Sequence, residues 1–393
     1  MERIELVPRL AQQGYEDDQV AARRAWLEAR TGVRLPLVGS SAIPAEQMRG
    51  NVENPIGAAQ VPLGVAGPLL VRGEAVDEVV YVPLATNEGV LVRSYERGMV
   101  AITRSGGAQT RVLRDENRVT PVFVCRNVAT ATELARWLPE QIEELRREAE
   151  ATTRHGRLLR VETLVSGRHV LVSFAYTTGD AHGMNMIVKA SHAACQWIER
   201  TGRAERYLIL SGACGEKRPG GALFAGGKGK SVTAGVTLPR RVLKAVLGVT
   251  ARQMEELWRL TLLGHLHAGT LGYNGQVANG LTALFIACGQ DVANVVNCAV
   301  AVTCFEEVGE GDLHASVQLP SLNVATVGGG TALGTAPECL ALLGCQGTGK
   351  VRRLTEITAA TILAGELSMG AAIASGEFVA AHETYGRNRP EQV

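Results

Sequence analysis

The chain has 393 residues, of which 46% are hydrophobic and 20% charged, as in ordinary globular proteins. Its 40 basic and 39 acidic side chains leave a formal net charge of +1, which excludes an electrostatic case for binding nucleic acid or an anionic membrane. The eight cysteines form no CxxC pair, so we expect a reduced, cytosolic chain with buried thiols and no zinc or other metal site.

The first part of the chain predicts helices and strands separated by glycine and proline. The opening MERIELVPRL has no apolar signal region, and no apolar run approaches the roughly 18 residues of a membrane span. Residues 19–31 predict a helix that ends at Gly32. The Gly/Pro-rich segment 53–71 is expected to be buried and irregular. A strand over 78–86 and a helix over 87–107 follow.

Residues 121–210 give the clearest pattern. We expect a β-α-β-β-α-β order, the ferredoxin-like or split βαβ arrangement. The predicted helix after the first strand opens with a capping box from Thr130 to Glu133. A Ser166–Gly167 turn joins the two central strands. The predicted elements are a strand at 121–128, a helix at 130–150, strands at 156–165 and 168–178, a helix at 185–202 and a strand at 206–212.

The remaining chain predicts mostly helices. The segment 274–296 is apolar on nearly all sides, so we expect a central, buried helix there. These elements predict an α+β fold, with a large domain around that helix and an inserted, non-Rossmann, ferredoxin-like domain. The expected divisions are a helical segment at 1–50, a large domain at 51–120 and 211–375, the small domain at 121–210, and a terminal helix and tail at 376–393.

Charged residues within apolar segments are candidates for functional residues. Asp291 lies within LFIACGQDVANVV, and a carboxylate in an apolar helix needs a cation or several donors. It is therefore interpreted as a paired, functional acid. Taken alone, Glu88 in ATNEG is interpreted as an acid at the positive end of a helix dipole. Taken alone, the charged run 216–218 is interpreted as a solvated turn and His382 as an exposed residue, although an imidazole on a mobile terminal helix could also be a general acid.

Two glycine-rich segments resemble phosphate-binding loops. GCQGTGKV, at 344–351, matches GxxxxGK but ends in valine and follows a predicted helix. GGKGKS lacks the first glycine of that motif, because Phe224 stands there. No GxGxxG lies between a strand and a helix, so neither a nucleotide triphosphatase nor a Rossmann site is expected.

Eight ordered motifs carry a resemblance to a known family. They are ENPIGAAQVPLGVAGPL, ATNEGVLVRSYERG, GDAHGMNMI, GACGEKRP, LGYNGQVAN, ACGQDVANVV, TVGGGTALGT and LAGELS. The chain closely resembles the soluble catalytic portion of the 3-hydroxy-3-methylglutaryl-CoA (HMG-CoA) reductase family, without the membrane anchor of the animal enzymes. The motif DAxGMNM resembles the eukaryotic and archaeal form of the family. The resemblance implies NADPH-dependent, four-electron reduction of HMG-CoA to mevalonate and free CoA through a hemithioacetal and an aldehyde.

The resemblance also implies a role for each catalytic residue. Lys217 is the cation for the developing oxyanion, and Asp291 is the acid that holds it. His382 protonates the departing CoA thiolate, and Glu88 supplies a proton to the aldehyde oxygen. A homo-oligomer with active sites at the dimer interface is implied as well.

Cofactor and substrate residues follow by the same resemblance. NADPH is preferred over NADH because Arg154, with Thr153, matches the segment that meets the 2′-phosphate. The other expected cofactor-binding residues are Asp180, Gly183, Met184, Asn185, Gly328, Gly329 and Gly330. The expected substrate-binding residues are Arg97, Arg118, Ser211, Arg218 and Asn279.

Several recognition positions depart from the family pattern. The lysine loop reads ACGEKRP where CTDKKP is usual, and Val119 takes the place of an arginine, with Arg118 one residue earlier. Gln276 replaces a histidine, and His182 stands where a neutral Met is expected, beside the proposed cofactor phosphates. The alternatives are therefore a reductase of a related 3-hydroxyacyl-CoA, NAD-linked mevalonate oxidation, or a non-catalytic acyl-CoA-binding homologue.

Overall fold

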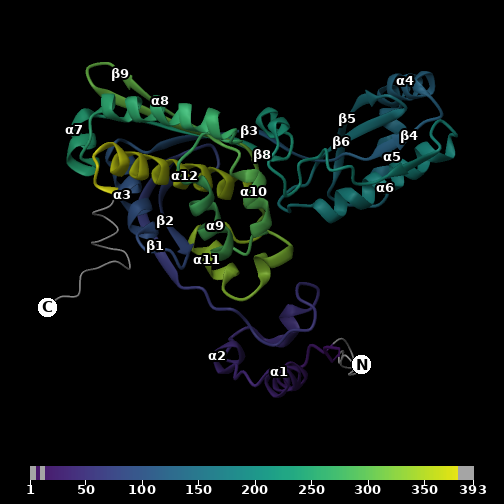
Figure 1. Cartoon of the computed structure of the whole chain (residues 1–393), viewed down its shortest axis with the longest axis horizontal. Helices are drawn as coiled ribbons and strands as arrows, with labels where there is room; N and C mark the ends of the chain where they lie inside the picture. The colour runs from purple at the N-terminus through teal and green to yellow at the C-terminus, as the bar shows by residue number, and fades with distance from the viewer. Residues whose placement is uncertain (1–5, 9–13, 379–393) are drawn as a thin grey trace.

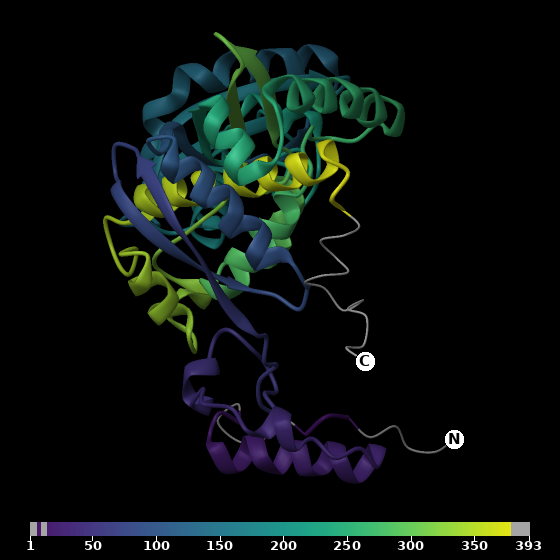
Figure 2. The ribbon, with the colours of Figure 1, turned by 90° about the vertical axis from the view of Figure 1, so that its left-hand side faces the viewer.

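The computed structural model describes residues 6–8 and 14–378 and shows a mixed α/β fold with a large, mainly antiparallel sheet. Figure 1 shows a large central body, a smaller α/β unit on one side, and an amino-terminal helical segment that lies apart from both. That segment contains α1 (Asp17–Thr31), which ends at left-handed Gly32 as predicted, and α2 (Pro36–Gly39). Figure 2 shows the same segment below the large body. The fully buried Arg23 stabilises it by donating to the carbonyl oxygens of Pro8, Gly14 and Pro55.

The large body is organised around α12 (Val351–Ala374), which runs through its middle (Figure 1). By length and composition this helix could cross a membrane, but 83% of its most apolar 18-residue stretch is buried inside the protein. The burial identifies α12 as a core helix. Around it lie α3 (Leu91–Arg104), α7 (Arg240–Val242), α8 (Ala251–Ala268), α9 (Val277–Ala287), α10 (Val295–Cys298) and α11 (Ala336–Leu342).

The sheet of the large body has the order β3-β8-β10-β9, with all neighbours antiparallel. β1 runs parallel to β3 at one end and pairs antiparallel with β2. The strands are β1 (Leu63–Arg72), β2 (Asp77–Ala85), β3 (Ala108–Val119), β8 (Gly229–Leu238), β9 (Val302–Val308) and β10 (Asp312–Leu322). The expectation of an irregular segment over 53–71 is therefore wrong for its second half, where β1 contains a register shift between Ala66 and Leu69.

The smaller unit has the predicted order of elements. Its strands pair in the order β7-β4-β6-β5, and every neighbouring pair is antiparallel. The elements are β4 (Val122–Val124), α4 (Val128–Trp137), α5 (Ile142–Glu150), β5 (Arg157–Ser166), β6 (His169–Thr177), α6 (Met184–Arg200) and β7 (Arg206–Leu208). The unit has a hydrophobic core of its own, separate from that of the large body.

Two details of the first helix in this unit differ from the prediction. The capping box joins Asn127 to Thr130, because the Asn127 side chain accepts from the Thr130 N–H. The α-helix is also interrupted at 138–141 by a 3₁₀ turn that contains Pro139. Proline removes a backbone donor and clashes with the preceding turn, which explains the break.

The predicted central helix over 274–296 is shorter than expected. α9 is buried but ends at Ala287, and the chain continues through left-handed Gly289 to a 3₁₀ turn at Val292–Asn294. A Cβ at Gly289 would overlap the carbonyl oxygen of Gly330, so only glycine permits this approach of two loops. The break turns Asp291 out of the helix and into a loop.

Candidate active site

The expected partnership between Lys217 and Asp291 is present in the structure. Lys217 Nζ lies 2.8 Å from Asp291 Oδ2, although the two residues come from loops far apart in the sequence. Lys217 has a left-handed backbone, with φ of 53°, and its N–H donates to the Asn297 side-chain oxygen at 3.2 Å. A left-handed lysine is uncommon and is often found where a side chain must be aimed precisely.

The environment of this pair is not the one that the sequence predicted. The side chains of Lys217 and Asp291 are 47% and 42% exposed, so the carboxylate is not desolvated inside an apolar helix. Asp291 instead caps the 3₁₀ turn that follows α9, where it accepts from the Ala293 N–H at 3.2 Å and from Asn294 Nδ2 at 3.1 Å. Its orientation is therefore fixed by the loop, while one face remains open to a ligand.

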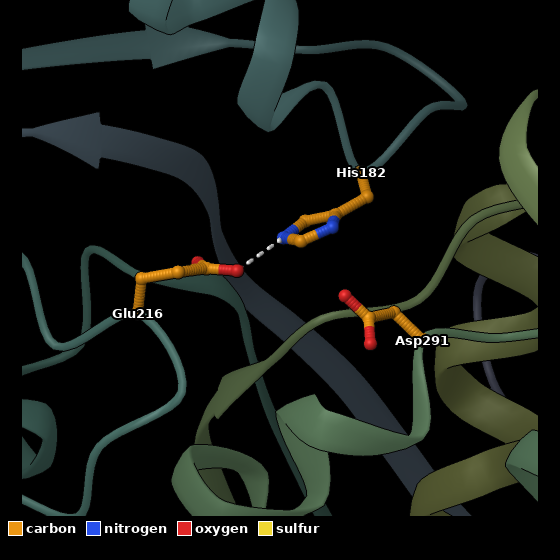
Figure 3. Close-up of side chains that lie close together, drawn as sticks. All are labelled: His182, Glu216 and Asp291. Carbon is orange, nitrogen blue, oxygen red and sulfur yellow. Dashed lines mark ion pairs between the residues drawn. The ribbon is translucent and has the colours of Figure 1, made fainter. Parts of the chain in front are cut away.

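A second ion pair lies immediately beside the first. Glu216 precedes Lys217, and its Oε2 lies 2.5 Å from the ammonium of Lys228, which is 0% exposed. Its Oε1 lies 3.7 Å from His182 Nε2 (Figure 3). Burial raises the pKa of Glu216, but the His182 imidazole and the Lys228 ammonium outweigh it and lower the pKa to about 2. Glu216 is therefore ionised at neutral pH.

His182, Glu216 and Asp291 point toward one another from three different loops (Figure 3). Their nearest ligand-type atoms lie within 4.8 Å of one another. Each carboxylate already has a lysine partner, so the cluster balances two acids against two ammonium groups. Neither His182 Nε2 nor Glu216 Oε2 has an aligned hydrogen bond within the described residues.

The side chain of Asp180 makes structural hydrogen bonds at the start of α12. Its carboxylate accepts from the N–H groups of Gly349, Lys350 and Val351 at 2.8, 3.0 and 3.1 Å. These donors lie at the start of α12, in the segment that resembles a phosphate-binding loop. Here a carboxylate of the chain itself occupies the position that a phosphate takes in such loops.

The turn after Asp180 leads into α6 in a form that leaves backbone donors available. Gly183 is the left-handed N-cap, with φ of 75°, and no side chain of the described residues caps the helix. Met186, in the first turn, lies close to both Gly183 and Gly156, since a Cβ at either glycine would meet its Cε within 3.3 Å. This contact brings the Thr153–Gly156 turn beside the start of α6. Met184 is half-buried and Asn185 and Arg154 are exposed.

The glycine loop 328–330 lies on the Asp291 side of the site. Gly330 packs against Gly289, two residues before Asp291. Gly328 and Gly329 have positive φ of 79° and 55°, and a Cβ at either would meet no atom within 4 Å. Their backbone therefore borders open space next to the lysine–aspartate pair.

Glu88 lies in the loop between β2 and α3 and borders a cavity of about 500 Å³. Asn279 Nδ2 donates to Glu88 Oε1 at 3.4 Å, so these two expected site residues meet. Arg97 lines the same cavity and donates to the Ser368 hydroxyl and carbonyl oxygens at 3.0 and 2.6 Å. Within the described residues, no hydrogen bond or ion pair joins Glu88 to Lys217 or Asp291. His382 lies outside the described residues.

The remaining substrate candidates surround the lysine loop. Ser211 donates to the Thr120 carbonyl oxygen at 2.6 Å, and Arg218 is exposed, with a 3.3 Å bond to the Glu216 carbonyl oxygen. Arg118 lies beside Gly227 and has a buried Nε without a partner in the described chain. Sequence reasoning missed Lys228 and Asn117, which are buried next to the site. The available signal was a lysine between glycines, GGKGKS, before an apolar strand.

The fold and the site together define a class: a mixed α/β protein whose lysine–aspartate pair lies between a strand–helix turn and a glycine loop. Residues 19–387 match the family model for hydroxymethylglutaryl-coenzyme A reductase. The chain therefore belongs to the hydroxymethylglutaryl-coenzyme A reductase family.

Relatives agree with that assignment. The 3-hydroxy-3-methylglutaryl-coenzyme A reductase of Methanothermobacter thermautotrophicus is 43% identical over 374 residues, covering 94% of each chain. That of Aeropyrum pernix is 42% identical and covers 95% of this chain and 91% of its own. A class II enzyme of Streptococcus pneumoniae, solved with NADPH bound in open conformations, has a TM-score of 0.67 at 19% identity. It covers 94% of this chain and 100% of its own, and it supports the fold. The archaeal relatives agree with the predicted eukaryotic and archaeal form.

Proposed function

We propose that this chain is a cytosolic reductase that converts HMG-CoA to mevalonate and free CoA at the expense of two NADPH. The observation that carries the proposal is the 2.8 Å pair of Lys217 and Asp291 beside the turn that opens α6. Family membership and the archaeal relatives support the same reaction.

The lysine–aspartate pair suits the reduction of a thioester. When hydride adds to the carbonyl carbon, negative charge develops on the oxygen, and a preorganised cation stabilises it. The Lys217 ammonium is half-exposed and fixed by Asp291 and by its own left-handed backbone, so it is oriented before substrate arrives. Glu88 is the proposed proton donor to the aldehyde oxygen, and His382 the proposed donor to the CoA thiolate.

The residues present fit a nicotinamide dinucleotide. The uncapped N–H groups of α6 provide donors for a pyrophosphate, and the open backbone of Gly328 and Gly329 allows close approach. Arg154, which is exposed on the neighbouring turn, suits a 2′-phosphate and favours NADPH over NADH. NADPH supplies the hydride. We place this function on residues 121–210, as a ferredoxin-like cofactor domain inserted into the large domain.

A second copy of the chain completes the proposed site. Glu88 and Asn279 line a cavity between α3 and α9, whereas Lys217 and Asp291 lie on loops beside the smaller unit. Since no described contact joins the two groups within one chain, we assign the large cavity to the acyl-CoA and propose a homodimer with active sites at its interface.

The test is a turnover assay with purified protein and HMG-CoA. Two NADPH should be oxidised for each CoA released, and an absence of oxidation with both NADPH and NADH would contradict the proposal. One alternative, a related 3-hydroxyacyl-CoA as substrate, is favoured by the ACGEKRP loop and by the Nε of Arg118, which has no hydrogen-bond partner among the described residues. A panel of acyl-CoAs compared by kcat/KM separates the two reactions.

A further inference from the structure

Four residues, one of them in the candidate cofactor turn, form a closed ring of contacts. Asn117 Nδ2 donates to the His182 carbonyl oxygen at 3.1 Å, and Asn117 Oδ1 accepts from Lys228 Nζ at 2.8 Å. Lys228 pairs with Glu216 at 2.5 Å, and Glu216 returns to the His182 imidazole at 3.7 Å. The ring therefore links β3, the residue that precedes β8, the lysine loop and the turn before α6.

The ring contacts both the backbone and the side chain of His182, and its weakest interaction is the one between the imidazole and Glu216. The backbone of His182 is fixed by a neutral hydrogen bond, whereas its Nε2 faces Glu216 without an aligned hydrogen bond. A protonated imidazole there faces two carboxylates, Glu216 and Asp291, whose own cations are Lys228 and Lys217. A neutral imidazole contributes no charge to the same contact. Imidazoles ordinarily change charge between about pH 5 and 8.

The position of this link connects two parts of the site. His182 directly precedes Gly183, the N-cap of α6, and Glu216 directly precedes Lys217. A contact between the two side chains therefore fixes the proposed pyrophosphate donors relative to the proposed oxyanion cation. Residues in direct contact are usually coupled energetically, whereas distant residues act independently.

We propose that His182 is a positioning residue that, in its protonated form, joins the cofactor turn to the Lys217 loop through Glu216 and tightens NADPH binding. The proposal rests on the cofactor assignment above. It also explains two departures from the family pattern that occur together. His182 stands where a neutral residue is expected, and Glu216 stands where aspartate is usual and extends one methylene further toward the imidazole.

The experiment measures the Kd of NADPH by fluorescence, without turnover, from about pH 6 to 8.5, a range chosen around the ordinary imidazole titration. The wild-type Kd should rise about 5-fold across this range, and H182M should remove the pH dependence. H182Q, which keeps a neutral polar side chain, should also remove it if H182M folds poorly. His169→Gln, on the exposed start of β6, is the matched control and should keep the wild-type slope.

A double-mutant cycle makes the contact itself the measured quantity. H182M and E216D should each raise the NADPH Kd, and the double variant should fall short of the product by about 5-fold, because both remove one link. Multiplicative effects, or a pH slope that survives in H182M, overturn the ring while NADPH binding and turnover persist. If the wild type binds no NADPH, the cofactor assignment and the ring both fall.

Discussion

Asp180 is the residue for which structure and sequence give different expectations, and its replacement separates them. A residue that only contacts the cofactor can be removed without changing the stability of the free protein. The carboxylate of Asp180 instead accepts three N–H groups at 2.8–3.1 Å at the start of α12, the central helix. Asp180→Ala should therefore destabilise the protein in the absence of NADPH.

The size of the effect follows from the capping geometry. Loss of a helix cap costs about 0.5–2 kcal/mol, and loss of a negative charge at a helix N-terminus adds about 0.3–1 kcal/mol. We expect about 2 kcal/mol in total, because Asp180 is partly exposed and water replaces some of the lost bonds. An unfolding entropy of roughly 2.1 cal/mol/K per residue over 393 residues converts this loss into a fall in Tm of about 2.5 °C.

Differential scanning calorimetry without cofactor measures this difference directly. Asp77→Asn is the control. The side chain of Asp77 is 64% exposed and pairs with Arg72, and exposed pairs contribute only about 0–1 kcal/mol to stability. If the Asp180→Ala protein melts with the wild type but loses NADPH affinity, the structural reading of this carboxylate is wrong. A lowered Tm with near-normal NADPH affinity supports it.

Three further predictions test the rest of the site. Lys217→Ala should lower kcat by about 100-fold or more, as expected for loss of an oxyanion partner, whereas the exposed Lys244→Ala should retain wild-type kcat in the same NADPH assay. Glu216 has a folded-state pKa of about 2 against an ordinary 4.5, so its charge stabilises the protein fully above about pH 5, and this contribution is lost as the pH falls toward 2. The stability gap between wild type and Glu216→Gln in urea unfolding should therefore be largest near neutral pH and shrink at pH 3; an unchanged gap would refute the assignment. Gly289→Ala should destabilise the protein by about 2 kcal/mol or more in calorimetry, since it adds a steric overlap to a left-handed φ, whereas Gly309→Ala, also left-handed but in open space, should cost about 1 kcal/mol; equal losses would show that the loop approach is unimportant.

Local patterns account for the parts of the fold that were predicted. The hairpin of β5 and β6 and the helix α6 show strong periodicity, and their own side chains form the core of the smaller unit. Strand β3 is absent from the predicted elements because its sequence, AQTRVLRDENRV, is rich in charged residues. The pairing of those charges is non-local: Arg160 of β5 reaches Glu116, and Lys230 of β8 reaches Asp115. No window of a single sequence contains such partners.

The same limit applies within the site. The left-handed turn at Gly289 is set by a backbone contact with Gly330, 41 positions along the chain, so the apolar run that contains both helix and loop is indistinguishable from one longer helix. The contacts that involve Lys228 and Asn117 likewise depend on β3 and β8 lying side by side. The position of Lys228 and Asn117 beside the site is therefore known only once the sheet is assembled.

Asp291 shows that a correct pairing can be inferred from an incorrect premise. The sequence argument required a buried carboxylate to find a cation, yet the carboxylate is 42% exposed and its lysine 47% exposed. Exposed pairs contribute about 0–1 kcal/mol to stability, so the fold has little energetic reason to keep this one. It is nevertheless kept: Lys217 holds the left-handed backbone that is costly for a non-glycine residue, and Asp291 is oriented by capping the 3₁₀ turn that follows α9. That balance is expected of a pair maintained for its orientation toward a ligand, and it supports the catalytic assignment more strongly than burial would have done.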